Sequence, residues 1–357
     1  MQSQEHKANE LLIIIPTTKL GEMIRGTLET LKIQTFQAFD TLIVANGVDE
    51  EPPWWMAEEF PFVDVQTLPS RAGFAAAVNA GIRTTHHPLI FLLNDDARPA
   101  PDCLAHLMEA QEKYSEFAGF ASRICFYYSP SVLESAGDGF SLAGRGFHRG
   151  WRANDGPPYD REEEVFGACA AAALYRREIF DEAGLFEEDF FAVHEDVDLA
   201  FRARRKGFRF LYLPQAKVLH KGSVTLGTKS EQSVYLDSRN SELVLLKNLP
   251  FAGFLKIFPW YILYTYHAFF CAFRNGRLWP YLRGKFHVLG RIGRMLRKGT
   301  LIELEATVPF DEVAEHFDQE WHWQGLRRVM RDWRAILLAL SVPILIFLFL
   351  YWFLIVD

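Results

Sequence analysis

The organisation of this chain follows from residues 89–96, which read Leu-Ile-Phe-Leu-Leu-Asn-Asp-Asp. Five large apolar residues in a row predict a strand that is buried on both faces, as in a parallel sheet covered by helices. The strand stops at Asn94, Asp95 and Asp96, and open α/β sheets bind ligands at this carboxyl edge. Neighbouring carboxylates repel each other unless a cation lies between them. The stretch therefore favours a divalent metal that holds a polyphosphate.

A second interpretation of the same stretch needs no ligand. Asp96 precedes Ala-Arg-Pro-Ala-Pro and a helix expected around residues 102–114, so its carboxylate is also suited to a helix cap. Taken alone, the stretch slightly favours the cap. The metal hypothesis thus depends on what the rest of the chain supplies.

Strands and helices alternate on the amino-terminal side of this stretch. The apolar run at residues 11–15 predicts a buried strand, and residues 41–45 and 63–68 predict the next two strands. Helical periodicity occupies residues 20–34, and a second helix opens at Gly73 and runs through Ile82. This alternation predicts a doubly wound, mostly parallel sheet of the nucleotide-binding type, with right-handed crossovers.

Composition excludes several classes of protein. The 357 residues are 49% hydrophobic, which is enough for one large core or for one domain with an appendage. A net charge of -7 does not suggest a nucleic-acid partner. The polar amino-terminus leads straight into a strand, so no signal peptide is expected. The four cysteines are far apart without a CxxC pair, which argues against a disulfide framework and a zinc site: Cys103, Cys125, Cys169 and Cys271.

A second polar cluster follows at residues 190–199, which read Phe-Phe-Ala-Val-His-Glu-Asp-Val-Asp-Leu. Acidic residues in a first helical turn favour the helix dipole, so part of the cluster is ordinary capping. Capping needs one or two carboxylates, and this cluster has Glu195, Asp196 and Asp198. The surplus indicates a general base near an acceptor hydroxyl. His220 follows at the end of a later strand; such a histidine is usually structural, but it also suits a metal or diphosphate site.

The carboxy-terminal part has a different character. Residues 335–356 carry no charge and are long enough to cross about 30 Å of hydrocarbon. Four arginines precede this run, which places the bulk of the protein on the cytoplasmic side: Arg327, Arg328, Arg331 and Arg334. Residues 251–273 are aromatic and interrupted by Pro259, and a basic stretch follows. We expect helices that lie in the headgroup region there, with a re-entrant or second spanning hairpin as the alternative.

Taken in order, several short motifs resemble the family-2 glycosyltransferases of GT-A fold, in particular the bacterial rhamnosyltransferase-like branch. The resemblance covers roughly residues 10–245. Beside the apolar first strand, it rests on residues 45–47 (Ala-Asn-Gly), 73–74 (Gly-Phe), 79–81 (Asn-Ala-Gly), 93–96 (Leu-Asn-Asp-Asp), 167–169 (Gly-Ala-Cys), 195–199 (Glu-Asp-Val-Asp-Leu) and 220–223 (His-Lys-Gly-Ser).

The resemblance implies an inverting sugar transfer from a nucleotide-diphosphate sugar. It implies that Asp96 and His220 bind Mg²⁺ or Mn²⁺ and that Asp196 is the catalytic base. Glu195 and Asp198 would orient hydroxyl groups of acceptor or donor. The donor-binding residues that it implies are Pro16, Thr17, Asn46, Arg71, Gly73, Asn79, Asn94 and Asp95.

Three positions depart from the family pattern. Ala45 stands where an aspartate usually holds the pyrimidine ring, and Arg71 stands where an asparagine is common. The first strand ends in Pro16-Thr17-Thr18 rather than in a Tyr-Asn pair. Arg71 is suited to a phosphate contact instead.

These observations predict three regions: a GT-A catalytic domain at 1–245, basic and aromatic membrane-interface helices at 246–334, and a transmembrane anchor at 335–357. The expected partners are a nucleotide-diphosphate sugar, a lipid-linked glycan acceptor and membrane lipid, at the cytoplasmic face of a bacterial inner membrane. Rhamnose from a deoxythymidine-diphosphate donor is the first choice, by resemblance alone. The alternative is a non-catalytic member that binds nucleotide sugar or acts as a scaffold, and a glycoside hydrolase fits poorly.

Overall fold

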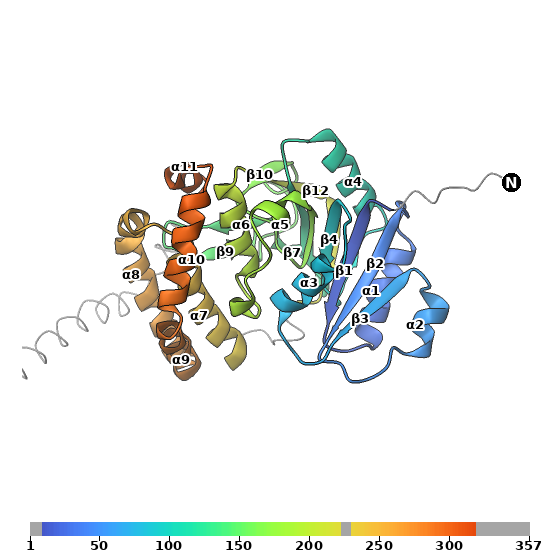
Figure 1. The fold of residues 1–357 in the computed structure, drawn as a ribbon, viewed down its shortest axis with the longest axis horizontal. Coiled ribbons are helices and arrows are strands. Elements are labelled where there is room, and N and C mark those ends of the chain that lie inside the picture. Colours follow the sequence, from blue (N-terminus) through green and yellow to red (C-terminus); the bar gives the residue numbers. More distant parts are fainter. Residues whose placement is uncertain (1–8, 223–229, 319–357) are drawn as a thin grey trace, which may run out of the picture.

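The computed structural model describes residues 9–222 and 230–318 of the chain. One sheet runs through the core in the order β10-β12-β6-β11-β4-β1-β2-β3, with β5 paired to β12 and β7 paired to β6. Helices cover the sheet, and a group of carboxy-terminal helices stands beside it (Figure 1). The expected transmembrane anchor at 335–357 lies outside the described residues.

The amino-terminal half of the sheet is parallel, as predicted. Strand β1 pairs in parallel with both β2 and β4, and β2 pairs in parallel with β3. Every residue of β4 is buried, as its unbroken apolar sequence predicts. The elements of this half are β1 (Leu11–Thr17), α1 (Glu22–Lys32), β2 (Phe39–Asn46), α2 (Trp54–Glu59), β3 (Val63–Leu68), α3 (Phe74–Arg83) and β4 (Leu89–Leu93).

The other half of the sheet is mixed, which corrects the expectation of a mostly parallel sheet. Strand β11 runs antiparallel to both β4 and β6, whereas β12 runs parallel to β6. Parallel pairing needs long crossovers, and the chain after β6 turns back through hairpins instead. The elements here are β5 (Ala97–Pro99), α4 (Cys103–Lys113), β6 (Gly119–Phe126), β7 (Ser129–Ser135), β10 (Glu163–Val165), β11 (Ala172–Arg176) and β12 (Phe210–His220).

The glycine-rich stretch at 136–158 contains a small antiparallel hairpin of β8 (Asp138–Phe140) and β9 (Gly146–His148). An isolated bridge joins Asp138 to Gly167, so the hairpin is attached to the segment before β11. The chain then forms α5 (Glu178–Glu182), the short 3₁₀ helix η1 (Glu188–Phe190) and α6 (Glu195–Arg205). Helix α6 carries the second acidic cluster in its first turn.

Five helices complete the described chain: α7 (Glu231–Asn248), α8 (Phe251–Arg274), α9 (Leu278–Leu289), α10 (Ile292–Glu305) and α11 (Phe310–Glu315). Helix α7 packs against α6, α9 and α10 and so joins this group to the sheet domain. The domain boundary expected at residue 245 falls inside α7. No helix within residues 9–222 and 230–318 has the length and apolar character needed to cross a bilayer, and this includes α8.

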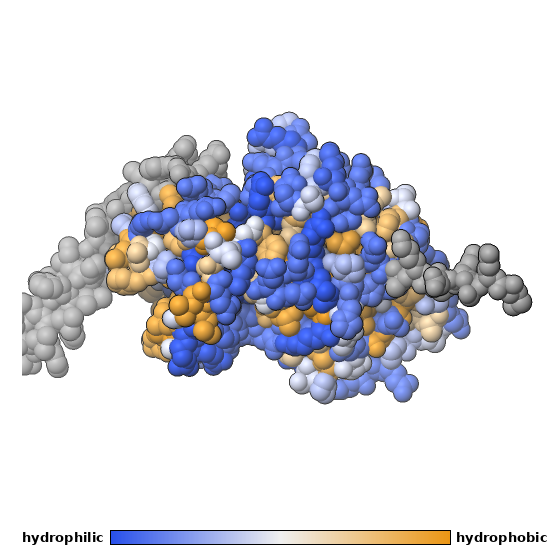
Figure 2. All heavy atoms as spheres, turned by 45° about the horizontal axis from the view of Figure 1, so that its top comes forward, coloured by the Kyte–Doolittle hydropathy of each residue, from blue (hydrophilic) through white to orange (hydrophobic). Residues whose placement is uncertain are grey.

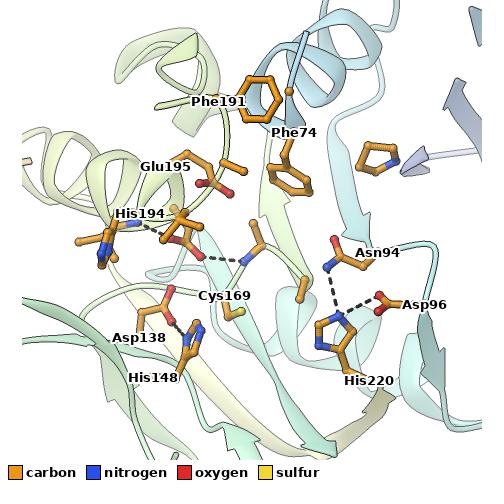
Figure 3. Close-up of a pocket in the computed structure, with 18 of the residues that line it drawn as sticks. Phe74, Asn94, Asp96, Asp138, His148, Cys169, Phe191, His194, Glu195 and His220 are labelled. Carbon is orange, nitrogen blue, oxygen red and sulfur yellow. Dashed lines mark hydrogen bonds and ion pairs between the residues drawn. The ribbon is translucent and has the colours of Figure 1, made fainter. Parts of the chain in front are cut away.

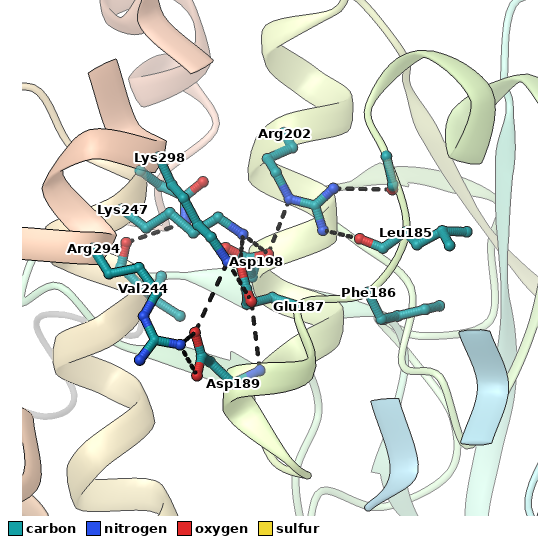
Figure 4. Close-up of polar contacts among 12 residues, drawn as sticks. Leu185, Phe186, Glu187, Asp189, Asp198, Arg202, Val244, Lys247, Arg294 and Lys298 are labelled. Carbon is teal, nitrogen blue, oxygen red and sulfur yellow. Dashed lines mark hydrogen bonds and ion pairs between the residues drawn. The ribbon is translucent and has the colours of Figure 1, made fainter. Parts of the chain in front are cut away.

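A buried cluster of charges fastens the carboxy-terminal helices to the sheet domain (Figure 4). Asp198 on α6 accepts hydrogen bonds from Arg202, Lys247 and Asn248, each at 2.9 Å. Lys247 also binds Glu187 at 2.9 Å, and Lys298 of α10 binds Glu187 at 2.7 Å. Burial raises the pKa of Asp198, but Lys247 and Arg202 outweigh it and lower the pKa to about 2. The cluster is therefore charged and fully paired at neutral pH.

Candidate active site

A pocket opens at the carboxyl ends of β1, β2 and β4 and extends to the amino-terminus of α6 (Figure 3). It has two walls. The first, the donor wall, consists of strand ends and loops: Pro16, Thr17, Thr18, Asn46, Arg71, Gly73, Asn94, Asp95, Asp96 and His220, backed by Glu134. The second, the acceptor wall, consists of the β8–β9 hairpin, the segment before β11, residues 191–197 and Asp237 of α7.

The donor wall brings the residues after β4 to the end of β12. Asp96 Oδ1 lies 2.9 Å from His220 Nε2, and Asn94 Nδ2 lies 3.2 Å from the same nitrogen. Strand β5 brings this about, because Ala97 pairs directly with His220 in the sheet. Backbone pairing thus brings Asp96 and His220 together, and their side chains and that of Asn94 then bind one another.

Glu134 of β7 holds the other side of the His220 ring, with Oε2 2.9 Å from Nδ1. Burial lowers the pKa of His220, but its hydrogen bonds to Asp96 and Glu134 raise the pKa to about 10. A carboxylate behind a histidine is the usual support for a metal-binding imidazole, since it fixes the ring and raises its basicity. Sequence reasoning missed Glu134.

The neighbouring Asp95 is also held in place. Thr17 Oγ1 donates to Asp95 Oδ2 at 2.5 Å. Burial raises the pKa of Asp95 to about 6, and the adjacent Asp96 adds to this rise. Two neighbouring carboxylates whose charges repel each other, of which Asp96 is buried and Asp95 half-buried, lie beside an imidazole that can bind a cation once its Nε2 proton is displaced. Such a set suits a divalent cation such as Mg²⁺ or Mn²⁺. These residues therefore fit a divalent cation.

A tight turn shapes the rest of the donor wall. Gly47 has a φ of 70°, and a Cβ there would lie 2.5 Å from the backbone nitrogen of Arg71. Asn46 accepts a hydrogen bond from Ala72 N at 2.8 Å and donates to Gly73 O at 3.0 Å. Asn46 thus holds the loop in place, and Arg71 is exposed at the pocket edge.

The acceptor wall places Asp196 at the start of α6, where its Oδ1 accepts from Val197 N at 2.8 Å and its Oδ2 from Ala170 N at 3.4 Å. Burial raises the pKa of Asp196 to about 6; nearby Asp138 raises it as well, and nearby His148 lowers it. Glu195 is buried, and its Oε2 has no hydrogen-bond partner within the described chain. Burial and the charge of Asp196 raise the pKa of Glu195.

The loop before α6 has an unusual backbone. Phe191, Val193 and His194 have positive φ angles of 67°, 73° and 70°, a region that non-glycine residues rarely occupy. Asn240 of α7 stabilises this backbone conformation. Its Nδ2 donates to the carbonyl oxygens of Phe190, Ala192 and Val193 at 3.0, 2.8 and 2.6 Å. The conformation of the loop next to Asp196 therefore depends on α7.

Helix α7 also contributes a charged group to the pocket. Asp237 binds His194 Nε2 at 2.9 Å and Arg145 Nη2 at 2.7 Å. Burial raises the pKa of Asp237, but Arg145 and His194 outweigh it and hold it well below the usual value. Asp237 is therefore ionised at neutral pH and holds His194 against α7.

Three further residues meet beside Asp196. Asp138, His148 and Cys169 each offer a ligand atom, and these atoms lie within 4.8 Å of one another. His148 Nδ1 binds Asp138 Oδ1 at 2.8 Å. Burial lowers the pKa of His148, but Cys169 and Asp138 outweigh it and raise the pKa well above its usual value. An imidazolium here balances the carboxylates of the acceptor wall.

Two of the residues implied by the resemblance lie outside the pocket, which corrects their expected roles. Asp198 points away from it, because its two oxygens bind Arg202, Lys247 and Asn248. Asn79 is a buried residue of α3, where it donates to Phe186 O at 2.8 Å and accepts from Phe186 N at 3.0 Å. Neither is free to touch a ligand. The other implied residues line the pocket together.

Fold and site together define a class. A sheet with two acidic groups at its carboxyl edge and a carboxylate at a facing helix start is the GT-A type of nucleotide-sugar-binding fold. Residues 12–184 match the sequence model described as "Glycosyl transferase family 2". The match covers slightly less than half of the chain and supports a glycosyltransferase of family 2.

Related proteins come from several bacteria. The chain is 25% identical to an N-acetylglucosaminyl-diphospho-decaprenol L-rhamnosyltransferase of Mycobacterium tuberculosis, over 61% of this chain and 78% of that protein. It is 23% identical to the O-antigen biosynthesis protein RfbC of Myxococcus xanthus, over 60% of this chain. The match covers only 17% of RfbC, so this chain corresponds to a small part of that relative.

Solved structures share the fold. The crystal structure of S. aureus TarS 1-349 superposes with a TM-score of 0.53 at 13% identity and covers 80% of each chain. GalNAc-T7 with UDP, GalNAc and Mn²⁺ superposes with a TM-score of 0.54 at 12% identity, over 68% of this chain and 48% of that one. At these identities the likeness concerns the fold.

Proposed function

We propose that the chain is an inverting glycosyltransferase that moves a sugar from a nucleotide diphosphate to an acceptor hydroxyl. The observation that carries this proposal is the facing pair of acidic groups in one pocket. Asp96 with His220 forms the donor wall, and Asp196 stands on the acceptor wall. Asp96 and His220 are suited to hold the diphosphate through a metal ion, and Asp196 is suited to accept a proton.

On the donor wall, Asp96 and His220 would hold Mg²⁺ or Mn²⁺, which stabilises negative charge on the departing diphosphate. Arg71 is exposed at the pocket edge and is suited to a phosphate oxygen. Asn94 and Asp95 line the same wall. Together they keep the diphosphate on the strand side of the pocket.

On the acceptor wall, Asp196 removes the proton of the acceptor hydroxyl. The hydroxyl oxygen forms a bond to the anomeric carbon as the bond from that carbon to the diphosphate oxygen breaks. The proton goes to the carboxylate of Asp196, and the electron pair leaves with the nucleoside diphosphate. Attack from the opposite face inverts the anomeric centre, so no covalent intermediate on the protein is needed.

The donor sugar and the acceptor are proposed from the name of a relative. Rhamnose is the proposed donor sugar, and the name of the mycobacterial relative supports it. The deoxythymidine-diphosphate carrier is proposed from the sequence resemblance alone. The same name supports a lipid-linked acceptor. We place the protein at the cytoplasmic face of a bacterial inner membrane, because residues 335–356 are uncharged and follow four arginines.

A thermal-shift screen of the full chain in detergent tests the proposal. The protein is mixed with a panel of nucleotide sugars in the presence of Mn²⁺, Mg²⁺ or EDTA. Selective, metal-dependent stabilisation by one donor is expected, because a ligand that binds only the folded state raises the melting temperature. No stabilisation by any donor, in a protein that melts cooperatively, would contradict the proposal and favour a scaffold role. Ala45 and Arg71, which depart from the family pattern, would then need explanation.

A further inference from the structure

Helix α9 has two unlike faces. Its inner face packs against α7, and Tyr281 and Val288 on it are 7% and 6% exposed. Its outer face carries Trp279, Phe286 and Leu289, which are 69%, 58% and 65% exposed. These three residues are spaced i, i+7 and i+10, so they form one stripe along the helix. An exposed apolar stripe of this kind on a helix usually marks a contact with a membrane, a ligand or another protein.

The neighbouring helices continue this exposure. Leu296, Leu301 and Leu304 of α10 are 50%, 57% and 76% exposed, whereas Met295 on the inner side is fully buried. The first turns of α8 add Phe251, Leu255 and Phe258 at 76%, 54% and 42%. Figure 2 shows apolar side chains gathered on the carboxy-terminal helices at the left of the view. We call these nine side chains of α8, α9 and α10 the apolar face.

The same helices are strongly basic. Residues 274–298 contain eight arginines and lysines and no acidic residue. Some of these cations are used inside the protein: Lys298 binds Glu187 at 2.7 Å and Arg294 binds Asp189 at 2.8 Å. Arg297 is exposed and makes no ion pair within the described part of the chain. Cations beside exposed apolar residues are complementary to an anionic lipid surface.

We propose that the apolar face lies on the surface of an anionic lipid bilayer, with Trp279, Phe286 and Leu289 inserted among the lipids. None of these helices, nor any other helix in the described chain, is long and apolar enough to cross the bilayer, which fits helices that lie in its surface. The sequence gives a second reason to expect a bilayer beside these helices. Residues 335–356 are uncharged over a length that matches a hydrocarbon core. The proposal does not depend on the sugar-transfer chemistry.

Photo-crosslinking in nanodiscs tests this contact with the full chain. Phe286 is replaced by p-benzoylphenylalanine, and the protein is reconstituted in phosphatidylcholine with 30% phosphatidylglycerol, a composition of about one-third anionic lipid. After illumination, mass spectrometry identifies what is attached to position 286. The same probe at Glu112, an exposed position on α4, is the matched control.

Lipid adducts at position 286, at least about fivefold more abundant than at position 112, are expected because interfacial side chains reach the acyl boundary. A crosslink to residues 335–356 would instead make the chain's own apolar segment the occupant, and a crosslink between two chains would make a second copy the occupant. Either result would overturn the proposal. So would equal lipid labelling at the two positions.

A charge variant tests the electrostatic part. Arg297→Glu should lower the yield of lipid adduct at position 286 about threefold or more in anionic nanodiscs and leave it unchanged in pure phosphatidylcholine. Lys113→Glu on α4, which makes the same change of charge away from the apolar face, should have no effect. An Arg297→Glu yield equal to that of Lys113→Glu would count against the anionic surface. Donor-induced thermal shifts are measured separately, so failure here leaves the proposed chemistry standing.

Discussion

The two walls of the pocket are built in different ways. The donor wall consists of residues at the carboxyl ends of β1, β2, β3 and β4 together with His220 at the end of β12. The acceptor wall consists of a hairpin, the segment before β11, a strained loop with the first residues of α6, and Asp237 of α7. Backbone pairing fixes the first wall, whereas long-range side-chain bonds hold the second. The donor wall should therefore tolerate changes behind it better than the acceptor wall does.

The largest effect is expected when Asp196, the proton acceptor on the acceptor wall, is replaced. Asp196→Asn should lower kcat about 10²- to 10⁴-fold, the usual contribution of a general base, and leave donor affinity nearly unchanged. The comparison requires this separation, because Asp196 and the donor-binding residues lie on opposite walls. Initial rates and calorimetric titration with donor measure it, with Asp102→Asn on the surface as control. Full turnover in Asp196→Asn would remove the residue from the mechanism.

The second prediction concerns the support of the acceptor wall. Lys247→Met removes one of the two cations that each of Asp198 and Glu187 binds, because Arg202 still pairs with Asp198 and Lys298 with Glu187. Breaking a buried pair costs up to about 3–5 kcal/mol of the free energy of unfolding, and the remaining partners reduce this loss. Lys256→Met removes an exposed pair with Asp311 and should cost less than about 1 kcal/mol. Urea denaturation of both variants gives the comparison. Equal losses in the free energy of unfolding would show that the buried cluster stabilises the protein no more than an exposed ion pair does.

The third prediction concerns Glu134, the carboxylate that binds Nδ1 of His220 on the donor wall. Glu134→Gln keeps the shape but weakens the hold on His220, so metal-dependent donor binding should weaken about 10- to 100-fold. The melting temperature of the ligand-free protein should change little, because backbone pairing with β5 fixes His220 independently. Donor titration over a range of Mn²⁺ concentrations measures the effect. An unchanged Mn²⁺ dependence would mean that Glu134 does not support a metal site.

The smallest expected effect is a pH dependence. The raised pKa of Asp196, about 6, means that the carboxylate base exists above this pH and is protonated below it. We expect kcat/KM to fall about tenfold per pH unit below about 6. The melting temperature of the ligand-free protein at pH 5 and pH 7 serves as the control for intact structure. A rate that is flat down to pH 4.5 would place the pKa of the base near its ordinary value.

The sequence predicted the donor wall well, because its signals are local. The strands predicted at 11–15, 41–45 and 63–68 correspond to β1, β2 and β3, and β4 is buried as expected. The unbroken run before Asn94 identifies a central strand, and the residues after it must lie at the sheet edge. His220 also reached this edge as expected, although its pairing with Ala97 left no trace in the sequence.

The acceptor wall could be predicted only in part. Asp138 follows Ser-Ala-Gly and precedes Gly-Phe, a pattern that reads as an ordinary turn. Asp237 lies in a helix whose sequence reads as a solvent-exposed face, although the residue lines the pocket. Asp198 was expected to line the pocket but does not: besides Arg202, four residues along α6, it binds Lys247, which is 49 residues away in the sequence. Contacts of this length depend on tertiary packing.

The strand order also governs how the chain folds during synthesis. Strands β1 to β4 are complete once residue 93 has left the ribosome, and the pairings of β1 with β2 and β4 and of β2 with β3 can then form. Strand β6 ends at residue 126, yet its neighbour β12 begins only at residue 210. At 5–20 residues per second, one edge of β6 stays open for roughly 4–17 s. An open strand edge invites pairing with other chains, so this interval is when a nascent chain most needs a chaperone.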